Sequence, residues 1–274
     1  MTAISIRNLW KEYGDQIVLE GINLEIAEHS FIALVGPSGC GKTTFLRMLL
    51  GEEPVTRGDI DVDGRRLAVE PGPDRGVVFQ RYSVFPHLTV LGNVVLAAEF
   101  QDAPLLGRLF GGRRRAAEAE ASRLLQAVGL LEAADKYPSQ LSGGMQQRLA
   151  LAQALMRRPK VLLLDEPFGA LDPGIRGDVH KLMIDLWRSH PLTVVMVTHD
   201  LSEAFTLATR VIALDRVRKR PEERERFGAT IINDIEVWPR RQAGPAAPPQ
   251  TLYRPGRDDP ALAAGPSRDG PVPA

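Results

Sequence analysis

A glycine-rich loop between an apolar run and a helical pattern constrains this chain more than any other feature. The loop reads GPSGCGKTT over residues 36–44, after the run 31–35 and before the helix-like stretch 45–50. Glycines allow successive backbone N–H groups to turn toward one anion, and a helix that begins there directs the positive end of its dipole at that anion. The order of strand, loop and helix therefore predicts a phosphate-binding loop rather than an ordinary glycine turn.

Two side chains of this loop indicate what kind of phosphate it would bind. Lys42 can reach the β- and γ-phosphates of a nucleotide, and the hydroxyl of Thr43 can ligate Mg²⁺. Cys40 is interpreted as a small filler within the loop, not as a nucleophile. The residues expected to surround the phosphates are Gly36, Pro37, Ser38, Gly39, Cys40, Gly41, Lys42, Thr43 and Thr44.

Composition limits the surroundings in which such a loop would work. The 274 residues carry no formal net charge, so a long polyanion such as DNA is not favoured as a partner. A single cysteine precludes an internal disulfide framework and is typical of a reducing compartment. No apolar run approaches the roughly 18 residues that span a bilayer, and the first residues do not resemble a signal peptide. We therefore expect a cytoplasmic protein whose contact with a membrane goes through a partner.

Short apolar runs alternate with helical patterns along most of the chain. Residues 4–26 are expected to form two or three strands around polar turns, and the Asp-Gly pair at 63–64 predicts a hairpin. Other runs are typical of parallel strands buried on both faces, and they occupy 31–35, 76–79, 161–165, 193–198 and 211–214. This alternation predicts an α/β protein with layered elements and an antiparallel edge.

The stretch 88–154 is helix-like, and we interpret it as a helical subdomain inserted between two core strands. Within it, residues 116–128 have alanines and charges at helical spacing. Residues 105–112, with the three arginines at 113–115, are instead expected to be a solvated loop between helices.

The end of the chain carries weaker signals. Residues 229–237 could hold one last strand. From 241 to 274 the sequence is rich in Pro, Ala and Gly and has too little apolar material to offset the entropy of ordering. We therefore predict a folded domain over 1–240 and a disordered tail over 241–274.

The apolar run 161–165 ends in two carboxylates. Asp165 is placed to hold Mg²⁺, directly or through water, beside Thr43. Glu166 can accept a proton from the water that attacks the γ-phosphate, or orient that water. A solvated acid at the end of a strand is the simpler alternative for Glu166. The phosphate loop earlier in the chain favours the catalytic interpretation.

A second glycine pair opens a helical pattern at 141–147, with the sequence LSGGMQQ. Ser142 can cap this helix, which would be a purely structural role. Gly143 and Gly144 also leave N–H groups exposed at the positive end of a helix, as in a second phosphate cradle. A chain that already holds one phosphate loop has no evident need of another. We therefore expect a homodimer in which this helix start closes on the nucleotide of the other copy.

Taken together, these motifs resemble the nucleotide-binding subunit of an ABC transporter, in the order in which that family carries them. By this resemblance, residues 36–44 are the Walker A loop, 161–166 are Walker B and 141–145 are the signature sequence. The resemblance implies an α/β fold: a P-loop NTPase core of RecA-like type with an antiparallel β subdomain and an inserted α-helical subdomain. It also implies ATP and Mg²⁺ as ligands and ATP hydrolysis as the activity.

Smaller motifs acquire roles only through the resemblance. Gln80 matches the Q-loop glutamine that senses Mg²⁺ and the γ-phosphate, and Tyr13 matches the aromatic residue that stacks on adenine. Asp172 matches the D-loop, and His199 matches the switch histidine after the last core strand. The implied catalytic residues are Lys42, Gln80, Glu166 and His199, the implied metal ligands are Thr43, Gln80 and Asp165, and the further nucleotide contacts are Tyr13, Ser142, Gly143, Gly144 and Asp172.

Sequence details favour an importer within this family. Residues 80–90 and 166–172 resemble importer subunits, and the short helical region resembles the nitrate, sulfonate and taurine group. The implied partners are permease subunits at the inner face of the membrane and, through them, a periplasmic solute-binding protein. Tyr82, Phe85 and Leu88 are candidates for contact with the permease, with core packing as the alternative. The charged stretch 216–227 departs from the short turn of that group, which puts the solute in question but not the ATP site.

Two other functions fit parts of the pattern. A soluble ABC ATPase acting on nucleic acid or ribosomes usually has two cassettes or long coiled coils, whereas this sequence has one cassette and a modest helical region. A non-catalytic nucleotide sensor is disfavoured because the lysine, both carboxylates and the histidine are all present. We therefore expect an ATP-driven subunit without a nucleic-acid partner.

Overall fold

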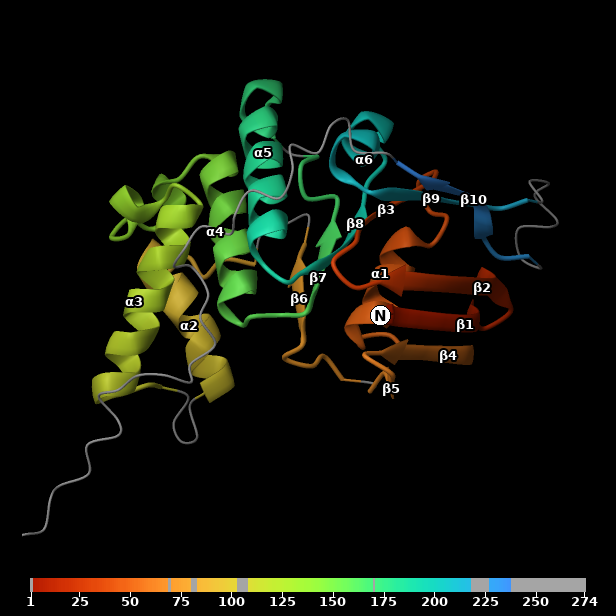
Figure 1. Ribbon diagram of the computed structural model, residues 1–274, viewed down its shortest axis with the longest axis horizontal. Coiled ribbons are helices and arrows are strands. Elements are labelled where there is room, and N and C mark those ends of the chain that lie inside the picture. The colour runs from red at the N-terminus through yellow and green to blue at the C-terminus, as the bar shows by residue number, and fades with distance from the viewer. Residues whose placement is uncertain are drawn as a thin grey trace, which may run out of the picture. The chain divides into compact units, whose positions relative to one another are not determined.

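Two β-sheets organise the computed structural model of this chain, which describes residues 2–68, 70–79, 83–102, 108–169, 171–217 and 227–237 (Figure 1). An antiparallel sheet has the strand order β2-β1-β4-β5, and a larger sheet has the order β10-β9-β3-β8-β7-β6. The strands of the antiparallel sheet are β1 (Thr2–Tyr13), β2 (Gln16–Ala27), β4 (Arg57–Val62) and β5 (Arg65–Arg66). Those of the larger sheet are β3 (Phe31–Val35), β6 (Arg75–Val78), β7 (Val161–Asp165), β8 (Thr193–Val197), β9 (Arg210–Asp215) and β10 (Thr230–Glu236).

Helices connect the strands of the larger sheet. In the described part of the chain they are α1 (Lys42–Leu50), α2 (Val90–Asp102), α3 (Gly111–Ala127), α4 (Gly143–Met156), α5 (Pro173–Ser189) and α6 (Leu201–Leu207), with 3-10 turns η1 (Leu131–Ala133) and η2 (Pro138–Gln140). None of these helices combines the length and the apolar character that crossing a bilayer would require.

The larger sheet is parallel except at one edge. Strands β9, β3, β8, β7 and β6 run in one direction, and β10 pairs antiparallel with β9. Every residue of β3, β7 and β8 is buried, as the uninterrupted apolar runs predict for strands covered on both faces. The α/β class and the antiparallel edge expected from the sequence are confirmed.

Alternating side chains of the larger sheet enter two different cores. Leu163 of β7 shares one core with Phe45 of α1 and with the antiparallel sheet. Its neighbour Leu162 points the other way, into a core with Leu149 of α4. Successive residues of a strand point to opposite faces. Helices α1 and α4 therefore cover opposite faces of this sheet, which matters for the site described below.

The predicted hairpins are confirmed. Strands β1 and β2 meet at a turn that contains Gly14, and β4 joins β5 through Asp63 and Gly64. Asp63 has φ of 50° and Gly64 has φ of 70°, the positive values that a tight two-residue hairpin turn requires.

One prediction within the helical region is wrong. The glycines and arginines at 111–115 form the first turns of α3 and not a solvated loop. The Nε atom of Arg114 donates to Glu118 one turn later at 2.8 Å, and its guanidinium pairs with Glu99 of α2 at 3.4 Å. A side-chain pair spaced by four residues stabilises a helix, and this pair extends α3 toward its N-terminus. The predicted loop residues 105–107, the tail 241–274 and the domain end at 240 lie outside the described residues.

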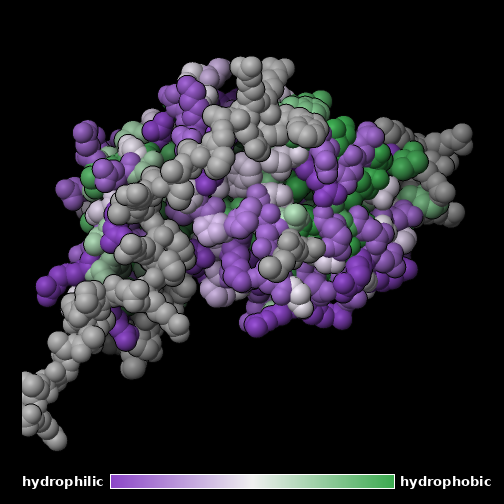
Figure 2. All heavy atoms as spheres, in the orientation of Figure 1, coloured by the Kyte–Doolittle hydropathy of each residue, from purple (hydrophilic) through white to green (hydrophobic). Residues whose placement is uncertain are grey.

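Hydrophobic side chains reach the surface over α6 and along β10 (Figure 2). They include Leu201 and Phe205 of α6 and Ile232 and Ile235 of β10.

Candidate functional site

The glycine loop between β3 and α1 has a shape that its own neighbours dictate. A Cβ atom on Gly36 would collide with the backbone carbonyl of Leu214, and one on Gly41 would lie 2.8 Å from Cδ2 of Leu19. Gly41 also has φ of 103°, which side-chain-bearing residues rarely adopt. Gly39 differs, because no described atom lies near the position of its missing Cβ. The loop is therefore packed against the protein at both ends and open in the middle.

The Lys42 ammonium and the uncapped start of α1 lie together at this loop. Helix α1 begins at Lys42 with no side-chain cap and no acidic residue in its first turn. Lys42 is 5% exposed, and its Nζ atom donates to the carbonyl oxygens of Gly36 at 2.9 Å and Pro37 at 3.0 Å. A buried ammonium at an uncapped helix N-terminus is a strong anion site. The residues present therefore fit a nucleotide phosphate.

Oxygen ligands for a metal lie beside the loop. The Oγ1 atom of Thr43 donates to Oδ1 of Asp165 at 3.2 Å, so two of the three predicted Mg²⁺ ligands are adjacent. Burial raises the pKa of the Asp165 carboxyl, and the hydrogen bond from Thr43 acts in the opposite direction. A carboxylate and a hydroxyl are hard oxygen donors that suit Mg²⁺ together with phosphate oxygens and water.

The ends of β7 and β8 bring together a carboxylate and an imidazole. Asp165 pairs in register with Val197, so the residues that follow these strands, Glu166 and His199, emerge at the same edge. The Nδ1 atom of His199 lies 3.3 Å from Oε2 of Glu166. Glu166 has φ of 45°, and its N–H donates to the carbonyl of Val197 at 2.9 Å. A strained left-handed residue held by a neighbouring strand is typical of a functional position.

Tyr13 stands at the end of β1 with its ring half exposed. Partial burial and the nearby Glu53 raise the pKa of its phenol, and the Thr44 hydroxyl opposes them, which places the ring next to the loop. The Nζ atom of Lys11 lies 4.6 Å from the ring centroid, so one face of the ring is covered. Its location near the loop is compatible with the predicted role beside a base.

The second glycine pair lies apart from the loop. Ser142 caps α4, accepting a hydrogen bond from the N–H of Met145 at 3.3 Å. A Cβ atom on Gly144 would collide with Ile175 of α5, whereas no described atom lies near the missing Cβ of Gly143. Packing within the chain thus explains Gly144 but not Gly143. Because α4 and α1 cover opposite faces of the sheet, one copy does not bring this glycine pair onto its own phosphate loop.

Asp172 precedes α5 as its N-cap residue, but its side chain does not cap the helix. Its carboxylate is exposed at the turn after β7. Two other predicted residues, the metal ligand Gln80 and the permease contact Tyr82, lie outside the described residues.

A small aromatic groove lies beside β6. It has a volume of about 170 Å³ and is lined by Phe79, Phe85, Phe100 and Arg157, among others. The buried amide of Asn93 fixes its rim by bonding the N–H of Phe85 at 2.7 Å and its carbonyl at 3.0 Å. The sequence indicated Phe85 but missed Phe100, which is 69% exposed, with its ring centroid 6.5 Å from that of Phe85. Leu88, the third candidate, is not among the lining residues.

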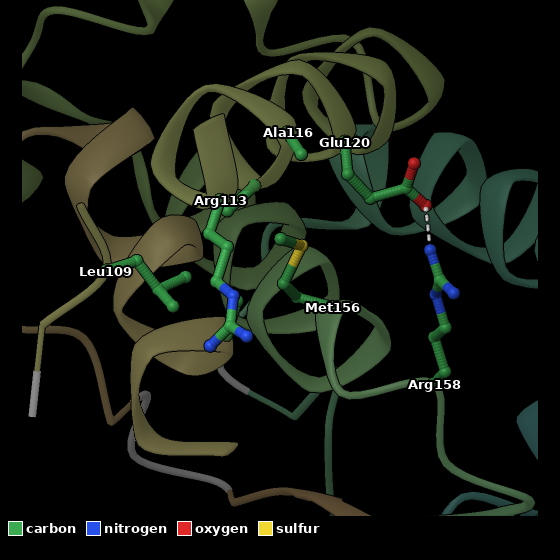
Figure 3. Close-up of a pocket in the computed structure, with 8 residues that line it drawn as sticks. Leu109, Arg113, Ala116, Glu120, Met156 and Arg158 are labelled. Carbon is green, nitrogen blue, oxygen red and sulfur yellow. Dashed lines mark ion pairs between the residues drawn. The ribbon is translucent and has the colours of Figure 1, made fainter. Parts of the chain in front are cut away.

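A second hollow, of about 570 Å³, lies within the helical region (Figure 3). Arg113 reaches into it between Leu109 and Met156, and Glu120 pairs with Arg158 at 3.6 Å on its other side. None of the predicted site residues lines it.

Comparison with known proteins places these features in one family. Residues 19–169 match the family model described as ABC transporter. The chain is 44% identical over 218 residues to the bicarbonate transport ATP-binding protein CmpC of Synechococcus elongatus, covering 77% of this chain and 31% of that protein. It thus spans about a third of the length of this relative.

Other relatives are matched over more of their length. The nitrate import ATP-binding protein NrtD of Synechocystis sp. is 43% identical, over 73% of this chain and 72% of NrtD. The aliphatic sulfonates import ATP-binding protein SsuB 2 of Xanthomonas axonopodis pv. citri is 43% identical, over 77% of this chain and 67% of SsuB 2. Among solved structures, the dimeric bacterial ABC transporter cassette MJ0796 is 30% identical, with a TM-score of 0.70 over 86% of this chain and 99% of that chain.

Proposed function

The chain belongs to the ABC transporter family, and on this basis we propose that it binds and hydrolyses ATP as the motor subunit of an importer. The observation that carries the proposal is the convergence of one lysine and two side-chain pairs at one edge of the larger sheet. Lys42 lies within the phosphate loop, Thr43 contacts Asp165, and Glu166 contacts His199. Phosphoryl transfer to water requires a cation for the phosphates, oxygen ligands for a metal and a base for the attacking water. These residues supply all three, with an imidazole beside the base.

Each residue has a task in this proposal. The Lys42 ammonium would exchange its two carbonyl acceptors for phosphate oxygens, and the N–H groups of the loop would add to it. Thr43 and Asp165 would hold Mg²⁺, with Gln80 as a further ligand, and the metal would neutralise charge that develops on the phosphates. Glu166 would accept the proton of the attacking water, and His199 would donate to the γ-phosphate. Tyr13 would pack its open face on the adenine.

The signature glycines would act on the nucleotide of a second copy. Gly143 leaves an open approach to the start of α4, and α4 is remote from the loop of its own chain. A homodimer would place the Ser142–Gly144 turn of each copy over the phosphate loop of the other, with Asp172 at the same seam. The dimeric arrangement of the related cassette MJ0796 supports this part of the proposal. Binding of ATP would then favour the closed pair, and hydrolysis would release it.

Permease subunits are the proposed partners at the membrane. The groove with Phe85 and Phe100 offers exposed aromatic rings at which a permease segment would dock. The subunit would sit at the cytoplasmic face of the membrane, and a periplasmic binding protein would deliver the solute. The proposed solute is of the nitrate, sulfonate and taurine type; relatives named for nitrate and for aliphatic sulfonates support this, and others are named for bicarbonate and for spermidine/putrescine. None of these relatives is named for nucleic-acid or ribosome work, so the alternative function receives no support.

Replacing the proposed base tests the function directly. In Glu166→Gln the phosphate loop is untouched, so ATP should bind and the chain should dimerise, while hydrolysis falls by about a hundredfold or more. Lys42→Ala is the matched control, in which ATP affinity itself should fall. The measurements are equilibrium binding of ATP, scattering for the dimer and phosphate release. Normal turnover in Glu166→Gln would rule out the assigned role.

A further inference from the structure

One guanidinium joins two turns that carry predicted site residues. Arg176, in α5, donates from Nη2 to the carbonyl oxygen of Leu171 at 3.2 Å, immediately before Asp172. Its Nη1 atom lies 3.4 Å from Oδ2 of Asp200 and 3.6 Å from Oε1 of Glu203. Arg176 therefore bridges the turn after β7 and the start of α6.

The two acids that form ion pairs with Arg176 also hold the residues on either side of His199. The Oγ1 atom of Thr198 donates to Oε2 of Glu203 at 2.8 Å and accepts from the N–H of Asp200 at 3.0 Å. Asp200 in turn caps α6, accepting from Ser202 and Glu203 N–H groups at 2.8 and 3.3 Å. His199 thus stands on a turn whose two flanking residues are both tied to this network.

Arg176 is the cation that compensates a buried acid. Glu203 is 4% exposed, and burial raises the pKa of its carboxyl, while Thr198 and Arg176 oppose that rise. Two imidazoles also act on Glu203: Nε2 of His180 lies 3.9 Å from its Oε1, and His199 lowers the pKa of its carboxyl less than Arg176 does. Burial, followed by the charge of Arg176, lowers the pKa of His180. His180 is therefore poorly suited to carry charge at neutral pH, and the guanidinium is the group that balances Glu203.

We propose that Arg176 is a positioning residue for hydrolysis, which holds the turn of His199 and the turn of Asp172 in one fixed arrangement. This inference rests on the proposed function. In the proposed dimer Asp172 lies at the interface between copies. A displacement of its turn when the dimer closes would then be transmitted to the turn of His199 by the Arg176 guanidinium, which is planar and has donors in fixed positions. Arg suits this task better than Lys, because its donors engage the carbonyl and both carboxylates at once.

The test replaces Arg176 by Met in the full chain and measures ATP binding and hydrolysis separately. A fluorescent ATP analogue should bind with a Kd unchanged within about twofold, because no atom of Arg176 belongs to the loop. The kcat should fall by about ten- to a hundredfold, as expected when a reacting group is displaced by about an ångström. Arg176→Lys should recover part of the rate. Arg188→Met is the matched control, because it removes an exposed charge from the other end of α5 and should leave kcat unchanged.

A second arm separates positioning from general loss of structure. In a His199→Ala background, measured by single turnover with enzyme in excess, Arg176→Met should cause no further fall. The double variant Arg176→Met, Glu203→Gln should likewise have the kcat of the slower single variant, since the two residues act as one unit. An equal fall in both backgrounds, or a loss of analogue binding in parallel with kcat, would overturn the inference.

The outcomes also separate this inference from the proposed function. A wild-type chain that hydrolyses no ATP contradicts the function. The inference alone is contradicted by a different set of results. In that set the wild-type chain hydrolyses ATP, Glu166→Gln abolishes hydrolysis, and Arg176→Met leaves the rate of hydrolysis unchanged.

Discussion

At the scale of single residues, the site is built from groups that are poorly solvated before any ligand arrives. Lys42 satisfies its charge with two loop carbonyls, and Asp165 is buried with one hydroxyl donor beside it. Glu166 holds a left-handed backbone conformation. Each of these features lowers the free energy of unfolding to some degree, because preorganised sites commonly reduce the stability of a fold.

Asp165 allows this effect to be measured. Its folded pKa lies above the ordinary value of 3.8, so folding disfavours its charged form. The destabilising contribution is absent below pH 3.8, grows as pH rises toward the folded pKa and is fully present above it. Asp165→Asn should therefore raise the free energy of unfolding of the nucleotide-free chain at pH 7 by about 1 kcal/mol, because the amide can still accept from Thr43.

The measurement is urea unfolding of both proteins at neutral and acidic pH, together with ATP hydrolysis. The stability difference should vanish in acid, and hydrolysis should be lost at neutral pH because the metal ligand is weakened. A variant less stable than the parent at pH 7 would contradict this account of Asp165.

Sequence alone located the residues whose roles depend on neighbours along the chain. The phosphate loop and the acids after β7 belong to continuous motifs, so their spacing gave their placement. The contact between Glu166 and His199 was not predicted; it arises because two parallel strands end at one edge of the sheet. Arg176 and Glu203 were missed, because in the sequence each is an ordinary charge on a helix, and only tertiary packing makes Glu203 buried.

At the scale of elements, the predicted strands β3 and β7 have the boundaries that their apolar runs indicate. Such strands are buried on both faces, so hydrophobicity marks their whole length. The start of α3 was harder to predict, because two glycines usually indicate a loop. Its first turns depend on contacts of Arg114 with Glu118 and with Glu99 of another helix, and the latter contact carries no local signal.

An ion pair that titrates in acid joins the edge strand β10 to β9. Nε and Nη2 of Arg210 donate to the two carboxylate oxygens of Asp234 at 2.7 and 2.5 Å, and Nη1 donates to the carbonyl of Glu25 in β2 at 2.6 Å. The hydrogen bonds from Arg210 lower the pKa of Asp234 below its ordinary 3.8. The contribution of this carboxylate is fully present above pH 3.8 and is lost as pH falls through the lowered value.

Asp234→Asn should therefore lower the free energy of unfolding at neutral pH by about 1 kcal/mol or less, because the pair is partly exposed and screened by solvent. The loss should shrink at high salt and disappear in acid. Asp178→Asn is the control, since Asp178 is an exposed acid of α5 that forms no ion pair with another described residue. Equal effects of the two substitutions would show that the pair contributes nothing to β10.

At the scale of the whole molecule, two adjacent glycines have different reasons to be glycine. The packing of the chain itself requires Gly144, whereas Gly143 would be required only by contact with a second copy. Gly144 leaves room for Ile175, so the chain's own packing accounts for it. Gly143 has open space where its side chain would be. The sequence marked both residues alike, because a glycine pair at a helix start does not show which face is covered.

Gly143→Ala should leave the unfolding temperature within about 2 °C of the parent, because the added methyl group meets no described atom and small effects move Tm little. ATP-dependent dimerisation and hydrolysis should nevertheless be lost, since the methyl group would occupy the approach to the helix start. Gly144→Ala is the paired variant, which should be destabilised by about 1–3 kcal/mol and partly restored by Ile175→Ala. A fully active Gly143→Ala protein would contradict the shared site.

Helices α1 and α4 cover opposite faces of one sheet. A twofold dimer of this chain would therefore have two ATP sites, each formed by the phosphate loop of one copy and the start of α4 of the other. Suppose that one copy carries a defective phosphate loop and the other a defective start of α4. Both defects would then lie in the same ATP site. The other ATP site would be formed by two intact parts, so mixing the two inactive variants should restore ATP hydrolysis.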